Sequence, residues 1–250
     1  MIQLKNKEQI AIMREAGRIT GEAILKAGEA VREGVTTKHL DDIVRRHIEK
    51  CGAVPACLGY EGFPASACVS VNDEIIHGIP SPHRVLHEGD IVKIDTCACY
   101  HGYIGDCANT FPVGRVSADA ERLIRAARDA FFKGLAQLAE GKRLGDIGSA
   151  IEEHVRSCGF SVLRDYTGHG VGREMHEDPN VPNYGTPGRG QRLLTGMTIA
   201  IEPMVCAGSN QVRVLPNEWT VQTVDGGWTA HFEHTVALTP DGVVILTEVG

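Results

Sequence analysis

The sequence predicts an α+β fold in which one helix–helix–strand unit is used twice. Three observations support this: two pairs of segments with helical spacing, short alternating strands after each pair, and a match between the halves at a shift of 107 residues, the offset from Gly34 to Gly141. We therefore expect a single domain, 1–250. A pseudo-two-fold axis would relate its halves, about 1–110 and 111–250.

The first half opens with two predicted helices. Apolar residues recur near helical spacing over 5–33, which predicts the first helix. The second is expected over about 38–50, with Thr37 as its N-terminal cap and Cys51 and Gly52 at its end.

Short strands broken by turns follow these helices. Residues 67–71 and 90–95 have the apolar, alternating pattern of strands. Residues 100–103 form a plausible turn, after which the chain can return antiparallel through Asp106.

The second half repeats this order. Helical spacing resumes over 118–139 and at about 145–157, and strands dominate from 160 onward. The internal match runs without a gap and pairs Gly34 with Gly141, His47 with His154, Cys51-Gly52 with Cys158-Gly159, Leu86 with Leu193, Gly89 with Gly196, and Asp95 with Glu202. Two equivalent acids are therefore expected to face each other across the axis.

Composition excludes several classes of function. The formal net charge is -7 and no Lys/Arg cluster is present, so a nucleic-acid surface is not expected. No apolar run approaches membrane-spanning length. The eight cysteines show no C-x2-C spacing and the N-terminus has no apolar signal stretch, so we expect reduced thiols and a cytoplasmic location.

Asp95 and Asp106 lie eleven residues apart, on either side of the predicted turn. A hairpin brings such carboxylates side by side, where like charges require a shared proton or a cation. Asp106, taken alone, is equally consistent with an ordinary turn aspartate, whereas Asp95 ends an apolar strand and needs a partner.

Three further residues add to this pair. His169 stands between glycines, and Glu202 and Glu233 each lie inside an apolar strand. Singly they fit a loop histidine and two buried acids with raised pKa values. Together with the aspartates they form a hard, oxygen-rich ligand set for two divalent ions, Mn, Fe(II), Co or Zn, that would activate a water for hydrolysis.

The order and context of these residues resemble the methionine aminopeptidases of the pita-bread metallopeptidase fold. The resemblance implies a single catalytic domain, 1–250, with a central antiparallel sheet covered by helices. The matching motifs are the segments 72–80, 89–95 with Gly105-Asp106, 168–172, Glu202-Pro203 and 233–235. The short chain, without an extra domain before the first helix or an insertion between Glu202 and Glu233, resembles the bacterial type I form.

The resemblance implies a role for each residue. Asp95 would bind one metal, Asp106 and Glu233 would bridge both, and His169 and Glu202 would complete the other. Glu202 would also accept a proton from the attacking water. His176 would stabilise the oxyanion, and His77 would hydrogen-bond the scissile amide nitrogen. Without the rest of the set, His77 is better explained as a turn histidine before Gly-Ile-Pro.

The resemblance also implies a methionine pocket. Its residues would be Cys57, Tyr60, Phe63, Cys68, Met175 and Trp219, each of which is also compatible with core packing. The chain departs from the family pattern at Glu61, at Glu174-Met175 and at His231, and we expect these positions at the pocket mouth, where they would alter substrate range.

The implied activity is removal of the initiator methionine from nascent proteins when the next residue is small. The partners would be nascent polypeptide N-termini, including those near the ribosome, and the chain would be a monomer without specific nucleic-acid or membrane binding. The alternatives are cleavage of X-Pro bonds by the same fold, creatinase-like chemistry, and a binding module that has lost its metals; the complete ligand set argues against the last.

Overall fold

The computed structural model describes residues 1–249 and shows an α+β arrangement with the predicted order of helices and strands. The four helices are α1 (Lys7–Glu29), α2 (Thr37–Lys50), α3 (Ala118–Leu135) and α4 (Leu144–Ser157). A single 3-10 turn spans Tyr60–Gly62. No helix within 1–249 is long and apolar enough to cross a membrane.

Two helices end earlier than the sequence predicts, for a shared reason. The first helix was expected over 5–33, but α1 starts after Asn6, whose side chain forms a capping box with Gln9, and it ends at Glu29. Likewise, α3 ends at Leu135 rather than at 139. Apolar residues beyond each end, Val31 and Leu138, still pack on the core, so helical spacing outlasts the helix.

The predicted cap of α2 is wrong by one residue. Thr36, not Thr37, caps the helix, and its hydroxyl accepts a hydrogen bond from the backbone N–H of His39 at 3.2 Å. The Thr37 hydroxyl is engaged elsewhere, because it accepts the backbone N–H of Ser81 at 2.9 Å.

The main sheet has nine strands, ordered β1-β4-β5-β14-β9-β7-β8, with β2 also on β4 and β15 on β14. Every pairing in it is antiparallel. Its strands are β1 (Val54–Pro55), β2 (Cys68–Val71), β4 (Ile91–Tyr100), β5 (Tyr103–Pro112), β7 (Gly168–Gly170), β8 (Glu177–Val181), β9 (Thr198–Ile201), β14 (Glu233–Thr239) and β15 (Gly242–Ile245).

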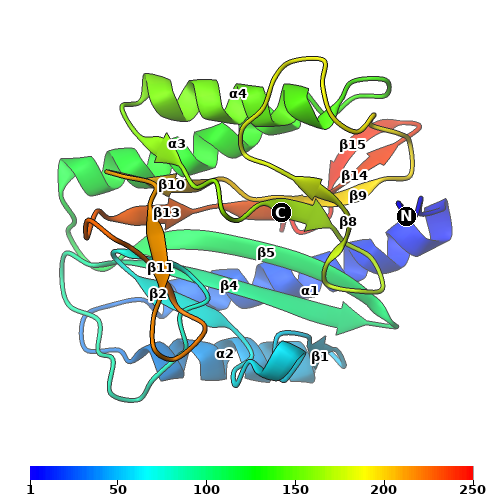
Figure 1. The fold of residues 1–250 in the computed structure, drawn as a ribbon. Helices are drawn as coiled ribbons and strands as arrows, with labels where there is room; N and C mark the ends of the chain where they lie inside the picture. The colour runs from blue at the N-terminus through cyan, green and yellow to red at the C-terminus, as the bar shows by residue number, and fades with distance from the viewer. Residues whose placement is uncertain (250) are drawn as a thin grey trace.

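Two three-stranded sheets complete the fold. One contains β13 (Thr229–His231), β10 (Met204–Cys206) and β6 (Ser161–Val162), and the other β11 (Val212–Val214), β12 (Val221–Thr223) and β3 (Glu74–Ile76). Figure 1 shows α1 and α2 in blue toward the bottom of the view, α3 and α4 in green toward the top, and the long β4–β5 hairpin crossing between them.

The β4–β5 hairpin has the tight turn expected at 100–103. Tyr100 pairs with Tyr103, and the two residues between them, His101 and Gly102, have φ of 48° and 76°. Positive φ at both central positions is the type I′ geometry that matches the twist of paired strands. This turn sets the register of the whole hairpin and hence the relative positions of its two aspartates.

Alternation along the hairpin separates a helix-covered face from an open one. Gly105 lies directly against α1, where a Cβ atom would come within 2.5 Å of the Gly17 Cα atom. The neighbouring Asp106 therefore points to the opposite face. Ile94 likewise packs in the core shared with the helices, while Asp95 points to the open face.

The predicted internal repeat is confirmed in backbone detail. An isolated bridge joins Thr36 to Val85 in the first half, and its equivalent joins Arg143 to Arg192 in the second. Each bridge sits beside a turn glycine with positive φ, 83° at Gly34 and 84° at Gly141, at the same offset that the sequence match predicted.

Candidate active site and metal centre

One row of paired residues across the main sheet carries much of the site. Asp95 of β4 pairs with Cys68 of β2 on one side and with Ala108 of β5 on the other, and Ala108 pairs with Glu233 of β14. Directly opposed residues in antiparallel strands share a face, so these side chains meet on the side away from α1. Glu202 follows β9 directly, one residue beyond the end of that strand.

Asp106 joins this row from the next pleat. It lies two residues from Ala108 on β5 and pairs with Cys97 of β4, so both point to the same face as Asp95. The Thr235 hydroxyl holds this part of the strand on both sides: it accepts the Asp106 N–H and donates to the Asp106 carbonyl, at 2.9 Å each.

His169 lies on β7 between two glycines that leave room for neighbouring backbone. A Cβ atom at Gly168 would lie 2.4 Å from the Ala200 carbonyl oxygen, and one at Gly170 would lie 2.3 Å from that of Asp178. The His169 Nδ1 donates to the Gly170 carbonyl at 2.9 Å, which leaves the Nε2 lone pair free to face the carboxylates. The bracketing glycines thus have a packing reason as well as a positioning effect.

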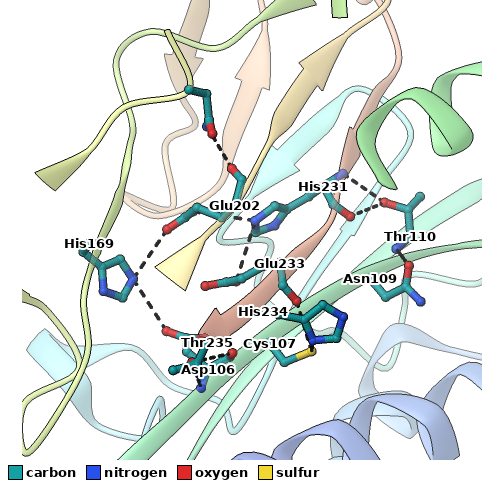
Figure 2. Close-up of polar contacts among 11 residues, drawn as sticks. Asp106, Cys107, Asn109, Thr110, His169, Glu202, His231, Glu233, His234 and Thr235 are labelled. Carbon is teal, nitrogen blue, oxygen red and sulfur yellow. Dashed lines mark hydrogen bonds and ion pairs between the residues drawn. The ribbon is translucent and has the colours of Figure 1, made fainter. Parts of the chain in front are cut away.

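The two histidines nearest the acids occupy equivalent places (Figure 2). The His169 Nε2 lies 3.6 Å from Asp106 Oδ2 and 3.5 Å from Glu202 Oε1. The His231 Nε2 lies 3.6 Å from Glu202 Oε2 and 3.7 Å from Glu233 Oε2. These separations are too long for good hydrogen bonds, and they match the ~3.4 Å expected between two tetrahedral ligands of one ion at about 2.1 Å.

Burial and mutual repulsion disfavour the ionised carboxylates. Burial, reinforced by Asp106, raises the pKa of Asp95 to about 8. Burial also raises the pKa of Asp106 to about 7 and that of Glu202 to about 8. The pKa of Glu233 is raised too, by burial first and then by Asp106. Without a compensating charge, these groups hold protons near neutral pH.

A divalent cation fits this arrangement. Two groups of ligand atoms lie close together, Asp95/His231/Glu233 and Asp106/His169/Glu233, each within 4.8 Å. Among residues 1–249, the buried Glu233 Oε1 has no hydrogen-bond partner, which is a gap that an ion would fill. Carboxylate and imidazole donors of this kind suit first-row divalent metals.

The five residues Asp95, Asp106, His169, Glu202 and Glu233 form an acid–histidine cluster. His77 and His176 lie beside this cluster in the same cavity. Burial, then His231 and His176, lowers the pKa of His77 to about 4, and burial lowers the pKa of His176, so both are neutral donors or acceptors at neutral pH. His77 has φ of 59°, a conformation that a non-glycine residue adopts only when its surroundings enforce it. His176 is tied through Nδ1 to the Tyr60 hydroxyl at 2.7 Å.

All thirteen site residues named from the sequence line one cavity. The acids, His169, His77 and His176 lie along it with the six residues expected to hold methionine. Of those six, Cys57, Phe63, Cys68 and Met175 are buried, whereas Tyr60 and Trp219 are partly exposed. Phe63 and Trp219 stack edge to face with ring centroids 5.0 Å apart.

The structure corrects the position expected for His231. We expected it at the pocket mouth, but its side chain is 2% exposed and lies among the acids. Glu61 does line the cavity, whereas Glu174 is exposed beside it. The signal for His231 was its spacing: two residues before Glu233 in an extended segment, it shares the face of that acid.

Sequence analysis also missed Cys97, which lines the cavity beside Asp106. Strand alternation offered a usable signal, because Cys97 lies two residues after Asp95 on the same strand. A lone cysteine in a strand usually packs in the core, so the pattern alone does not mark Cys97 as a site residue.

The raised carboxyl pKa values predict an unusual pH dependence for the metal-free protein. The folded state keeps protons that the unfolded chain releases above about pH 4, so stability is highest at low pH and falls as the pH rises through 7–8, the folded pKa values of Asp95, Asp106 and Glu202. Melting temperatures in EDTA should therefore fall from pH 5 to pH 8. The same scan with bound Co or Mn should be flatter, and a metal-free melting temperature that rises over this range would contradict the interpretation.

The fold and cavity together fit one class of protein, the metal-dependent hydrolases, because they gather acids and histidines that could hold divalent ions at one site. The comparisons agree with this class. The sequence matches metallopeptidase family M24 over residues 11–240. It is 52% identical to a methionine aminopeptidase of Clostridium acetobutylicum over 247 residues, 99% of each chain, and 49% identical to methionine aminopeptidase 1 of Bacillus subtilis over the whole of both chains. The chain belongs to metallopeptidase family M24.

Solved structures confirm the pita-bread fold. A methionine aminopeptidase from Thermotoga maritima superposes with a TM-score of 0.98 at 44% identity and covers all of both chains. A prolidase from Pyrococcus furiosus shares the fold with a TM-score of 0.77 at 24% identity, and 66% of that longer chain is covered.

Proposed function

We propose that this protein removes the N-terminal methionine from proteins and peptides whose next residue is small. The observation that carries the proposal is the placement of the acid–histidine cluster in the same cavity as a mostly buried set of sulfur and aromatic side chains. An unbranched thioether fits such polarizable walls well. The closely similar relatives are methionine aminopeptidases over their full length.

In this proposal the metal ligands are Asp95, Asp106, His169, Glu202 and Glu233, and residues 1–250 form one catalytic domain. The main sheet supports a single domain, because it joins β4 and β5 from the first half to β9 and β14 from the second. Membership of a metallopeptidase family implies divalent metal use; we propose two ions, with Co, Mn, Fe(II) and Zn as candidates. Bound there, such ions supply a nucleophile from water near neutral pH.

The remaining steps fall to side chains. Glu202 takes the proton of the attacking water, because its carboxylate lies among the acids and faces the cavity. When Tyr60 donates to its Nδ1, the neutral His176 carries its proton on Nε2 and can donate to the developing oxyanion. His77 hydrogen-bonds the scissile amide nitrogen, and its ring lies 6.3 Å from that of Trp219 in the cavity wall.

We further propose a monomeric enzyme of the cytoplasm that acts on nascent chains, including those still near the ribosome. All eight cysteines are free thiols, which is usual in reducing compartments. In this proposal the substrate carries methionine first and a small residue second.

The deciding experiment uses metal-stripped protein and separate additions of Fe(II), Mn, Co and Zn. We expect release of methionine from a Met-Gly-X tripeptide with at least one metal and little cleavage of Ala-Pro peptides. Turnover of Ala-Pro but not Met-Gly substrates would favour the X-Pro alternative. No methionine release with any metal would defeat the proposal.

Glu61 and Glu174 predict a preference for basic residues that follow the methionine. Both are exposed acids near the cavity, and an exposed ion pair contributes about 0.2–1 kcal/mol. We expect kcat/KM for Met-Ala-Lys to exceed that for Met-Ala-Glu by up to about fivefold, and Glu61→Gln to reduce the ratio, with Glu153→Gln as an exposed control. Equal efficiencies in the unmodified protein would refute the preference.

A further inference from the structure

The side chain of His231 is buried among acids without a hydrogen-bond partner. Its ring is 2% exposed, and among residues 1–249 neither Nδ1 nor Nε2 makes a hydrogen bond. Leaving a buried polar group without a partner destabilises the folded protein. A bound ligand that contacts the His231 ring nitrogens would remove this cost.

Hydrogen bonds and strand pairing fix the backbone of His231. The Thr110 hydroxyl accepts the His231 N–H at 2.9 Å and donates to the His231 carbonyl at 2.7 Å (Figure 2). Residue 231 also pairs with Met204 in the β10–β13 ladder. The imidazole is thus presented to the acids by two strands and a side-chain clamp.

The geometry around His231 matches that around His169. Each Nε2 lies between oxygens of two carboxylates, at 3.5–3.6 Å for His169 and 3.6–3.7 Å for His231. Glu202 is shared, with one oxygen toward each histidine. Both histidines also belong to groups of ligand atoms that include Glu233.

We propose that His231 is a sixth protein ligand, which binds through Nε2 the divalent ion held by Asp95 and Glu233. This inference rests on the proposed metal-dependent function and extends its ligand set, so that each ion has one imidazole. Imidazole favours Zn, Fe and Co over Mn or Mg at the position it joins. The metal position that contains Asp95, His231 and Glu233 would therefore differ from a position with oxygen donors alone.

The test measures the metal centre directly. Metal-free protein is titrated with zinc by calorimetry, and the zinc K-edge X-ray absorption spectrum is recorded at one and two equivalents. We expect two zinc ions per chain and about one imidazole per zinc in the unmodified protein. In His231→Gln, the second equivalent should bind at least about tenfold more weakly, and the imidazole count per zinc should fall to about half.

His234→Gln is the matched control. His234 is a half-buried histidine one residue after Glu233, but it contacts Thr247 at 2.7 Å and Phe131 rather than the acids, so its loss should leave the imidazole count unchanged. The wild-type imidazole count tests the proposal even if His231→Gln folds poorly.

An unmodified protein with two zinc ions but only one imidazole between them would overturn the proposal. So would weaker zinc binding in His231→Gln without a change in imidazole count, since that result would make His231 a neighbour of the ligands. In both cases methionine release by the unmodified protein would show that the proposed function stands. A protein that binds no metal and releases no methionine would instead overturn the function itself.

Discussion

Glu202→Gln should leave the fold intact and reduce kcat for methionine release by roughly 10²–10⁴-fold. The amide keeps the size of the side chain but cannot take a proton from the attacking water. The Glu202 backbone stays anchored, since its carbonyl accepts the Asn183 side-chain amide at 2.8 Å. Steady-state kinetics on a Met-Ala peptide should show the loss in kcat, with KM little changed.

Two controls make this result specific. Glu153→Gln replaces an exposed glutamate on α4 and should keep normal turnover. Metal content measured on the same preparation separates loss of the base from loss of the metal. Near-normal turnover in Glu202→Gln would refute the role assigned to this carboxylate.

Asp106→Asn should abolish metal-dependent turnover and yet stabilise the metal-free protein. Burial raises the pKa of Asp106 to about 7, with Glu202 adding to the rise, so at pH 8 the folded protein bears an ionised, poorly solvated carboxylate. A neutral amide of the same shape removes that cost, which we expect to raise the free energy of unfolding by about 1 kcal/mol or more, or roughly 2–4 °C in melting temperature.

The comparison is made in EDTA at pH 8 and again at pH 5. The gain should shrink at pH 5, where the Asp106 carboxyl is already protonated in the folded state. Asp241→Asn, at the exposed turn between β14 and β15, should change neither stability nor activity. An Asp106→Asn variant that is less stable than the parent at pH 8 would show that the carboxylate is not under electrostatic strain.

The local sequence pattern was sufficient to predict structural features that depend on residues close together in the chain. The β4–β5 hairpin follows from a two-residue turn, so the proximity of Asp95 and Asp106 was predictable. The repeat, which pairs Asp95 with Glu202, follows from residue identity at one offset. Helix ends were less predictable, because Val31 and Leu138 pack on the core after the backbone has left the helix.

The sequence by itself determined the α+β class, the internal repeat and the set of acids and histidines that gather in one cavity. Only the tertiary structure decided where His231 lies. Its place depends on the docking of β13 against β10 and on the Thr110 clamp from β5, contacts between segments far apart in the chain. Strand alternation indicates which residues share a face of a sheet. How deeply a side chain such as His231 is buried depends on the segments that pack over that face, and these are known only from the assembled sheets.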